Sequence, residues 1–352
     1  MKKINIAIIG AGRMGQLHTK NFEYFVYGAN VKAVCDQEKA LAQKHATEVE
    51  AEVYSDVSVL LLDESIDAVV ITTPVQTHKT FVLQALEAGK HVFCEKPLCL
   101  NIEDANEMYQ KAKETKKVFQ VGYMRRFDKG YETAKQKISE GAIGTPVFIR
   151  STSRDPGLPP VPGWGCFPEK SGDISFELCS HDYDSIRWLL DDEVESVFGQ
   201  AAVLSSIKEK DICGGTMMND TIALTLKFSR GALGTVEGLL NIKYGYDART
   251  EIIGDEGVIS IGQMNYIDVV TGTSEHKISL PTAPSFTDRF AEAYIKEGQH
   301  FIDCIFSGQT PLVGVRDGLE AVKIAAAVNK SIQLAAPVNV TGEMLYGSNI
   351  SN

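Results

Sequence analysis

The segment Ile4-Asn5-Ile6-Ala7-Ile8-Ile9 runs directly into Gly10-Ala11-Gly12-Arg13-Met14-Gly15. The apolar run predicts a buried strand, and the G-x-G-x-x-G pattern after it predicts a tight turn into a helix. In that setting Gly10 permits the turn, Gly12 lets the main chain approach a pyrophosphate, and Gly15 lets the helix pack on the strand. The helix N-terminus offers free N–H groups to the phosphates. We therefore predict a dinucleotide site in this loop, with Arg13 and Met14 as further contacts.

A second signal of this site is Asp36, which ends the next apolar segment, residues 31–35, and lies 21 residues after Gly15. A carboxylate that binds the ribose hydroxyls is expected about 20 residues on. Gln37 and Glu38 follow, with no arginine to bind a 2′-phosphate. The pattern favours NAD over NADP as the cofactor.

The bulk properties narrow the class of protein. A chain of 352 residues suggests two domains, and a net charge of −11 argues against nucleic acid or an anionic membrane as a partner. The seven cysteines form neither a C-x-x-C pair nor a zinc spacing, so we expect reduced thiols in a cytoplasmic protein. The apolar N-terminus is interpreted as a first strand rather than a signal peptide, and no stretch is apolar enough to span a bilayer.

Strand and helix patterns alternate in the first third of the chain, which predicts an α/β domain with a doubly wound parallel sheet. The strands are expected at 4–9, 31–35, 67–72, 91–94 and 118–121. Ligands of such sheets lie beyond the carboxyl ends of the strands. We therefore expect cofactor contacts from Thr73, Pro74, Glu95 and Lys96, which follow the third and fourth of these strands.

After about residue 123 the pattern changes to closely spaced strands, which predicts a C-terminal α+β domain with a large, mostly antiparallel open sheet. We expect strands at 146–152, 194–204, 220–228, 232–242, 248–254 and 257–261, and helices at 127–140, 173–190, 287–307 and 316–334. The sequence thus predicts a Rossmann NAD-binding domain over 1–123 and a substrate-binding and oligomerisation domain over 124–346. The uncovered face of the open sheet predicts a homo-oligomer.

The Glu95-Lys96-Pro97 turn lies where the nicotinamide of a dinucleotide would be. A lysine beside the positive ring and nearby carboxylates suits proton exchange with a substrate. The alternative interpretation of Lys96 is a surface lysine with an ion-pair partner.

A second group of chemical side chains lies in the segment 172–184. If one helix spans it, Glu177 and His181 are four residues apart and share a face. A carboxylate orients an imidazole for general acid/base work. A zinc site of Glu177, His181 and Asp184 would lack the paired histidines of helical zinc motifs, so we predict no metal.

Together these motifs resemble the glucose–fructose oxidoreductase/inositol dehydrogenase family over nearly the whole chain. The resemblance rests on residues 10–15, 72–78, 88–97 and 181–184, and on three segments similar to its inositol 2-dehydrogenase branch, residues 122–128, 152–156 and 243–254. It implies an NAD-dependent oxidoreductase that oxidises a secondary hydroxyl of a cyclic polyol, such as myo- or scyllo-inositol, to the ketone. It also implies a dimer or homotetramer.

The resemblance implies roles for individual residues. His78 would contact the cofactor, His181 oriented by Glu177 would act as the base, and Lys96 would stabilise the alkoxide. The reverse assignment, with Lys96 as the base, stays open. The cyclic polyol would be held by side chains that offer many donors and acceptors, namely Arg126, Asp155, Tyr244 and Tyr246.

Simpler alternatives stand beside these roles: an ion pair between domains for Arg126 and Arg154, and packing on a strand for the two tyrosines. The sequence also departs from the inositol branch at two places. Glu177 stands where that branch usually has aspartate. The loop from 157 to 170 looks longer, and its Trp164 would offer a platform for a pyranose ring or a glycoside.

Two rival functions therefore remain. One is an aldose or glycoside dehydrogenase, or a keto-sugar reductase, of the same family. The other is a non-catalytic sensor that binds NAD and a sugar, which would need neither Lys96 nor His181.

Overall fold

The computed structural model describes residues 3–157, 166–206, 212–214, 217–262, 271–272, 278–279 and 282–341. The chain divides into two compact units. The first comprises Met1–Phe127 and Glu292–Val322, and the second comprises Asp128–Ala291 and Lys323–Asn352. The first unit therefore takes up a segment from near the end of the chain.

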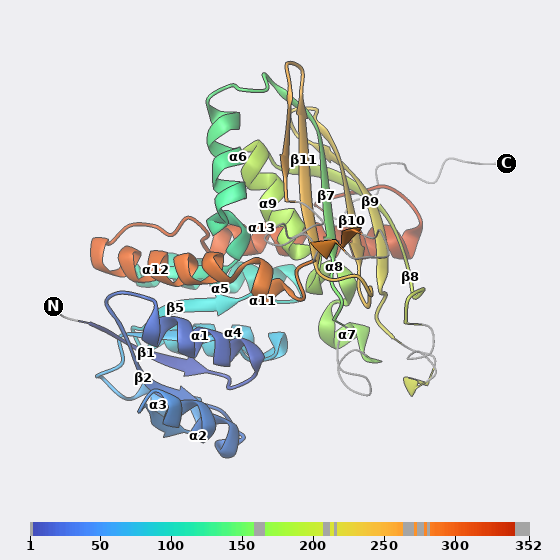
Figure 1. The fold of residues 1–352 in the computed structure, drawn as a ribbon. Helices are drawn as coiled ribbons and strands as arrows, with labels where there is room; N and C mark the ends of the chain where they lie inside the picture. Colours follow the sequence, from blue (N-terminus) through green and yellow to red (C-terminus); the bar gives the residue numbers. More distant parts are fainter. Residues whose placement is uncertain are drawn as a thin grey trace. The chain divides into compact units, whose positions relative to one another are not determined.

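The first unit contains a six-stranded sheet in which every pair of neighbours is parallel (Figure 1). The strand order is β3-β2-β1-β4-β5-β6, which is that of a doubly wound sheet. The predicted parallel sheet is confirmed, and the sequence missed only the three-residue strand β3. The strands are β1 (Ile4–Ile9), β2 (Ala29–Cys35), β3 (Glu52–Tyr54), β4 (Ala68–Ile71), β5 (His91–Glu95) and β6 (Phe119–Gly122).

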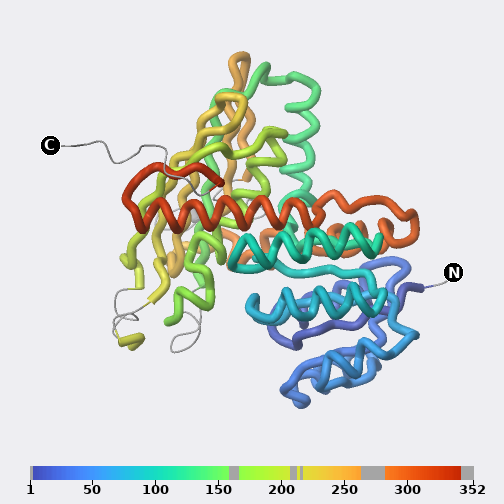
Figure 2. The backbone as a smooth tube through the Cα atoms, turned by 180° about the vertical axis from the view of Figure 1, so that it is seen from behind, coloured from blue at the N-terminus to red at the C-terminus, as the bar shows by residue number. Residues whose placement is uncertain are grey.

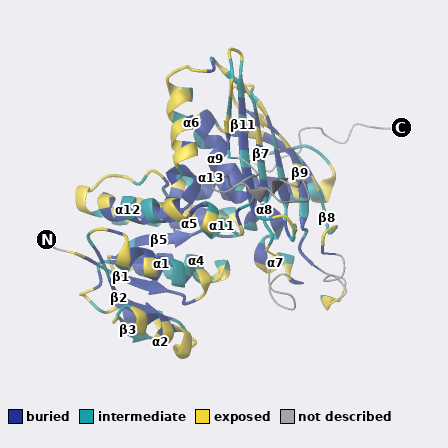
Figure 3. Ribbon diagram, in the orientation of Figure 1, coloured by how far each residue is buried: buried dark blue, intermediate teal, exposed yellow. Residues whose placement is uncertain are grey.

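Helices cover this sheet, and its strands are buried while the outer sides of the helices are exposed (Figure 3). The rings of Phe22, Phe93 and Phe301 pack edge to face in the core, with centroids 5.8–6.5 Å apart. Helices α4 and α5 contact each other and run side by side (Figure 2). The helices are α1 (Arg13–Tyr24), α2 (Lys39–Glu48), α3 (Val57–Leu61), η1 (Val75–Thr77), α4 (His78–Glu87), α5 (Ile102–Thr115), η2 (Met124–Phe127) and most of α12 (Ala291–Ser307).

The second unit is built on a seven-stranded sheet of order β12-β11-β7-β10-β9-β8-β15. All its neighbours are antiparallel except β7 and β10, which are parallel. The predicted large, mostly antiparallel sheet is confirmed. Its strands are β7 (Pro146–Arg154), β8 (Val194–Ala202), β9 (Thr221–Phe228), β10 (Leu233–Leu239), β11 (Asp247–Gly254), β12 (Val258–Ile261) and β15 (Val338–Asn339), and a separate pair is β13 (Thr271–Gly272) with β14 (Ile278–Ser279).

The helices expected after residue 123 differ from the prediction at two points. The single helix expected over 173–190 is two helices, α8 (Asp173–Glu177) and α9 (Ser180–Leu190), and the one expected over 287–307 is α11 (Phe286–Arg289) followed by α12. Leu178 and Cys179 keep α-type backbone angles although the helical hydrogen bonds are interrupted there. The apolar spacing therefore continues across the break and hides it. The second unit also contains α6 (Lys129–Ser139), α7 (Pro168–Ser171) and the second half of α13 (Val315–Leu334).

One face of this sheet is covered by helices, since α9 contacts β7 and α6 contacts both α9 and β12 (Figure 1). Side chains alternate along β7: Ile149, Ser151 and Ser153 are buried toward the helices, while Phe148 and Arg150 lie on the opposite face. The second face is thus left to side chains that are partly or fully exposed.

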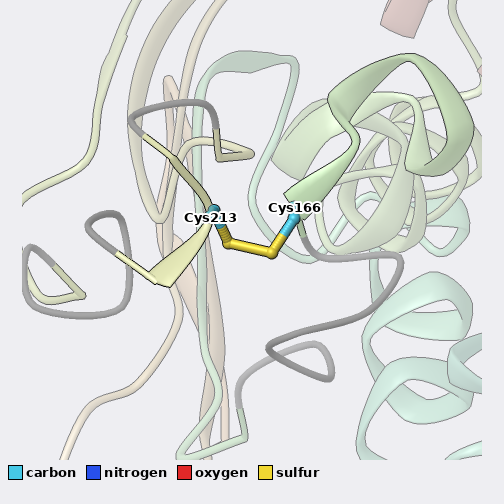
Figure 4. The surroundings of a disulfide bond; sticks show 2 residues. All are labelled: Cys166 and Cys213. Atoms are coloured by element: carbon cyan, nitrogen blue, oxygen red, sulfur yellow. A yellow bond between two sulfur atoms is a disulfide. The ribbon is translucent and has the colours of Figure 1, made fainter.

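The expectation that every cysteine is a reduced thiol is wrong. Cys166 and Cys213 form a disulfide, with Cα atoms 5.2 Å apart (Figure 4). The two lie 47 residues apart in sequence, and only the fold brings them together, so no local spacing could indicate the pair. The other five cysteines are free and buried. The cytoplasmic location stays a prediction.

No helix among the described residues is long and apolar enough to cross a membrane.

Candidate functional site

The glycine loop of the first unit is shaped by the close approach of three main-chain segments. Gly10 has a φ of +102°, and a Cβ on it would lie 2.9 Å from main-chain atoms of Thr72 and Thr73. A Cβ on Gly15 would lie 1.9 Å from the Gly10 carbonyl oxygen. Only glycine fits at either position. The start of α1 is thereby held against the ends of β1 and β4.

The N-terminus of α1 fits an anionic ligand. Gly12 is its N-cap residue, has no side chain to cap the first turn, and would carry a Cβ with nothing within 4 Å. The first turn holds no acidic residue, Arg13 is exposed, and Met14 is partly exposed. Free N–H groups and the positive end of the helix dipole thus face open space. These are the features that the phosphates of a dinucleotide require.

Asp36 lies beside this loop. Its carboxylate accepts hydrogen bonds from the main-chain N–H of Ala11 at 2.7 Å and of Glu38 at 2.9 Å. The ring of His45 on α2 contacts the Ala11 carbonyl oxygen through Nε2 at 2.9 Å. His45 is not predictable from the sequence, because nothing near it in sequence marks it as a support of the loop. The carboxylate at the end of β2 and the glycine loop at the end of β1 therefore form one structure.

The segment after β4 contains Thr73 and Pro74. The Oγ1 atoms of Thr73 and Thr77 are 2.7 Å apart, and the His78 ring contacts two carbonyl oxygens, that of Thr73 at 2.8 Å through Nε2 and that of Pro97 at 3.0 Å through Nδ1. His78 is 1% exposed, and burial lowers its pKa although the two carbonyl contacts raise it. Any effect of His78 on a cofactor would thus pass through the main chain.

Lys96 follows β5 directly, and the main chain around it is held by Glu95. One Glu95 oxygen, Oε1, lies 2.7 Å from Nε2 of His18, and the other, Oε2, accepts the Lys96 N–H at 3.1 Å. The Lys96–Pro97 peptide bond is cis. Lys96 is partly exposed while Glu95 is buried. The buried carboxylate of Glu95 therefore holds the lysine at the carboxyl ends of the parallel strands.

In the second unit Glu177 and His181 lie on different helices. Glu177 is the last residue of α8 and is partly exposed, while His181 is the second residue of α9 and is 7% exposed. The helix over which a shared face was predicted is therefore interrupted between them. The two residues remain on either side of the same helix junction.

The start of α9 is fixed to the sheet by Asp182, a residue that the sequence analysis passed over. Asp182 is fully buried and accepts hydrogen bonds from Ser151 Oγ at 2.6 Å and from Ser153 Oγ at 2.7 Å, both on β7. Because it follows His181 directly, it holds the backbone of that histidine against the sheet. Alternate serines on a strand are the one sequence signal that could have indicated this anchor.

Among the described residues, no group of three or more His, Cys, Asp or Glu side chains is placed to hold a metal ion.

Arg126 forms an ion pair, as the simpler alternative expected, but inside the first unit. Its Nη2 lies 2.7 Å from Asp317 Oδ1, its Nη1 donates to the Leu312 carbonyl at 2.9 Å, and it is 4% exposed. Both partners come from the C-terminal segment of that unit. The guanidinium thus ties the end of η2 to the start of α13.

Arg154 and Tyr244 share a polar cluster at the end of β7. Arg154 pairs with Glu237 and donates to the Tyr244 hydroxyl at 2.9 Å, which in turn donates to Asp247 at 3.1 Å. Asp155 follows Arg154, is partly exposed, and accepts the Gly157 N–H. The cluster gathers charged and hydroxyl groups at one end of the sheet.

Tyr246 has apolar surroundings, unlike the residues of this polar cluster. It is 4% exposed and packs against Phe286 and Phe290, with centroids 6.3 and 6.0 Å apart. The ring is therefore buried against two aromatic rings, just before β11, rather than half-buried on a strand. Trp164 lies outside the described residues.

Comparisons with known proteins agree with these features. Residues 4–123 match the model of the oxidoreductase family with an NAD-binding Rossmann fold, and residues 135–340 match the model of its C-terminal alpha/beta domain. A scyllo-inositol 2-dehydrogenase (NAD(+)) of Bacillus subtilis is 37% identical over 98% of both chains. A myo-inositol 2-dehydrogenase of Thermotoga maritima is 32% identical over 94% of this chain and 96% of its own.

Solved structures show the same likeness. The scyllo-inositol dehydrogenase of Lactobacillus casei, with bound NAD(H) and scyllo-inositol, superposes with a TM-score of 0.88 at 32% identity, over 97% of this chain and 100% of its own. The myo-inositol dehydrogenase of the same organism, with NAD(H) and myo-inositol, gives 0.84 at 28% identity over 99% of both. The resemblance found in the sequence is thereby confirmed. This chain belongs to the oxidoreductase family that joins an NAD-binding Rossmann fold to a C-terminal alpha/beta domain, the glucose–fructose oxidoreductase/inositol dehydrogenase family.

Proposed function

We propose that this protein oxidises one secondary hydroxyl of an inositol to the ketone, with NAD as the hydride acceptor. The observation that carries the proposal is the position of Lys96. It follows β5 on the sheet edge where the glycine loop and Asp36 also lie, so a lysine suited to proton transfer accompanies a site suited to a dinucleotide. The inositol is inferred from relatives that are 32–37% identical over at least 94% of this chain.

The first unit would hold the cofactor. The N–H groups at the start of α1 would bind the phosphates, Asp36 the ribose hydroxyls, and the segment at Thr73 and Pro74 would lie along the same edge. When bound, NAD supplies the hydride acceptor. Lys96 would stabilise the alkoxide that develops as the hydroxyl of the substrate loses its proton.

The second unit would supply the base. His181 lies in the first turn of α9, which Asp182 anchors to β7, so its imidazole stands on a rigid support, as a general base requires. Glu177 would orient it in the place of the aspartate usual in the inositol branch. The proton would pass from the substrate hydroxyl to His181, and the reverse assignment, with Lys96 as base, predicts the same products.

The inositol ring would be held by polar groups rather than by a countercharge. Asp155 and Tyr244 suit this role because they belong to or adjoin the polar cluster at the end of β7. Arg126 and Tyr246 suit it less, since the first is ion-paired and the second packs against two phenylalanines. Trp164 stays a prediction.

We also propose that residues 1–123 form the cofactor domain and residues 124–346 the substrate and oligomerisation domain of a homo-oligomer. An apolar row crosses the face of the second sheet opposite α6 and α9, where Phe148 pairs with Leu233 and with Ile253, and Ile253 pairs with Val258. Leu233 is 50% and Val258 58% exposed. A second copy of this chain would cover that row, and light scattering after size exclusion would contradict the proposal if the mass is that of a monomer.

The test of the function is NADH formation with myo-inositol, scyllo-inositol, D-chiro-inositol, D-glucose and D-xylose, each with NAD and NADP. We expect activity on an inositol with NAD, and a loss of ~10²–10⁴-fold in kcat for Lys96→Met with NADH affinity kept. Activity on an aldose alone would move the substrate to the sugar branch. Intact NADH binding without transfer of deuterium from any deuterated substrate would indicate a sensor.

A further inference from the structure

Two buried histidines hold the turn that carries Lys96, one on each side. His18, on α1, is 0% exposed and contacts Glu95, the residue before the lysine. His78, at the start of α4, is 1% exposed and contacts Pro97, the residue after it. The two histidines come from different helices and contact the two residues that flank Lys96.

The His18 contact has a defined direction. Nε2 lies 2.7 Å from Glu95 Oε1, while Nδ1 is buried without a hydrogen-bond partner among the described residues. A proton on Nδ1 would be a buried donor without an acceptor, so the imidazole carries its proton on Nε2 and donates it to Glu95. The rings of Phe22, Phe93 and Tyr294 surround His18, with centroids 5.1–6.1 Å away, and fix its orientation.

Glu95 passes this constraint to the lysine. Its second oxygen accepts the Lys96 N–H at 3.1 Å. Gly122 on β6 makes room for this carboxylate, since a Cβ there would lie 3.0 Å from Oε2. The Glu95 carboxylate is therefore held by an imidazole and a main-chain N–H, in the space that the glycine leaves beside β6.

His78 ties the other side of the turn to the segment after β4. Its Nδ1 lies 3.0 Å from the Pro97 carbonyl oxygen, and its Nε2 lies 2.8 Å from that of Thr73. A neutral imidazole donates to one of these oxygens at a time, and in either tautomer the ring fills the space between the two segments. It therefore sets the separation between the Lys96 turn and the Thr73 segment.

We propose that His18 and His78 are positioning residues for Lys96, which they hold through Glu95 and Pro97 respectively. The inference rests on the role of Lys96 in the proposed function. Neither ring is exposed to a ligand, so both act on the reaction only by holding the main chain at the lysine. A displacement of about 1 Å at a reacting group costs up to ~100-fold in rate.

The role of His18 is tested by comparing His18→Gln with His18→Asn. Glutamine places an amide donor where Nε2 lies and can still reach Glu95, whereas asparagine has the same chemistry and is one methylene too short. We expect kcat to fall ~10- to 100-fold in the asparagine variant and to stay within ~5-fold of wild type in the glutamine variant. The role of His78 is tested in the same way. His78→Asn keeps a donor toward Pro97, whereas His78→Leu removes both contacts, so kcat should fall further in the leucine variant.

The control is His91→Leu. His91 lies at the opposite end of β5, where its Nδ1 accepts the Val118 N–H at 3.0 Å, and its replacement should leave kcat unchanged. Rates are expressed per NADH-binding site from a fluorescence titration, so that unfolded molecules do not count. NADH affinity and KM for the polyol should change little in the asparagine variant, because the effect is on the position of Lys96.

Lys96→Met, measured in parallel, separates the two proposals. If it abolishes turnover while His18→Asn and His78→Leu keep wild-type kcat per site, the positioning role is refuted and the proposed function stands. If Lys96→Met itself turns over normally, the proposed role of the lysine fails. Equal losses of kcat in the asparagine and glutamine variants would also refute the role of His18, because only the glutamine side chain is long enough to reach Glu95.

Discussion

The Cys166–Cys213 disulfide should contribute measurably to the stability of the second unit. It closes a segment of 47 residues, and the chain-entropy relation gives about 4 kcal/mol for the loss of freedom that such a link imposes on the unfolded chain. Hydrogen bonds join the same two regions in the folded state, since Asp173 accepts both the main-chain and the side-chain N–H groups of Asn219. The folded state should therefore survive reduction, with a free energy of unfolding about 2–4 kcal/mol lower.

Urea unfolding followed by tryptophan fluorescence measures this loss. Both tryptophans, Trp164 and Trp188, belong to the sequence range of the second unit, so the signal follows the unit that contains the disulfide. Wild type is compared with and without dithiothreitol, alongside the variant with Cys166→Ser and Cys213→Ser. Reductant should lower the midpoint of wild type to that of the double variant and should leave the double variant unchanged.

A thiol count decides whether the link forms at all. The protein unfolded in denaturant without reductant should expose five thiols out of seven cysteines. Seven reactive thiols, or a wild-type midpoint that does not respond to dithiothreitol, would refute the reasoning. A full count of seven would also restore the original expectation that all the cysteines are reduced.

Two further results should follow from the first unit. Gly15→Ala puts a Cβ 1.9 Å from a carbonyl oxygen and should lower the free energy of unfolding by at least about 2 kcal/mol, measured in urea. Gly12→Ala puts a Cβ where nothing lies within 4 Å. It should instead weaken NADH binding ~10-fold in a fluorescence titration and leave unfolding little changed. Burial, together with the charge of Lys117, lowers the pKa of His91 to about 4. As the pH falls, the unfolded chain therefore binds the proton before the folded one does. The free energy of unfolding should decrease by roughly 1–2 kcal/mol between pH 6.5 and pH 4. His91→Gln should flatten that dependence, and an equal slope in the variant would contradict the assignment.

The parts of this fold that follow from the sequence are those in which the deciding residues are neighbours along the chain. The strand Ile4–Ile9 and the loop from Gly10 to Gly15 were predicted within their observed bounds, because an apolar run and a glycine pattern act through local sterics. The three-residue strand β3 was missed, because Glu52, Val53 and Tyr54 are too few to show a period.

The break between α8 and α9 shows a different limit. Glu177 and His181 have helical spacing, and Leu178 and Cys179 keep helical backbone angles, so periodicity continues through the break. What ends α8 is a change in hydrogen-bond pattern, in which the Leu178 and Cys179 N–H groups both donate to the Ile174 carbonyl. A pattern of apolar residues records which face is buried and carries no information about that change.

The supports of the candidate site escaped prediction because their partners are distant in sequence. Glu95 and Lys96 are adjacent and were predicted together, but His18 lies 77 residues before the carboxylate that it contacts. Arg126 makes the same point from the other side. It was assigned to substrate or to an ion pair between domains, and its partner Asp317 lies 191 residues later, in the same unit.

Reacting side chains and the residues that support them call for different tests of function. The reacting side chains, such as Lys96, recur in recognisable motifs, so their replacement asks only whether the general chemistry operates. The supports differ in kind: His18 acts on a carboxylate, His78 on two carbonyl oxygens, and Asp182 on two serines. Each is buried and holds main chain near the site, so its replacement should change the rate of the chemical step while the affinity for NADH stays. A kcat loss without an affinity loss would separate positioning from binding at each of these three residues in turn.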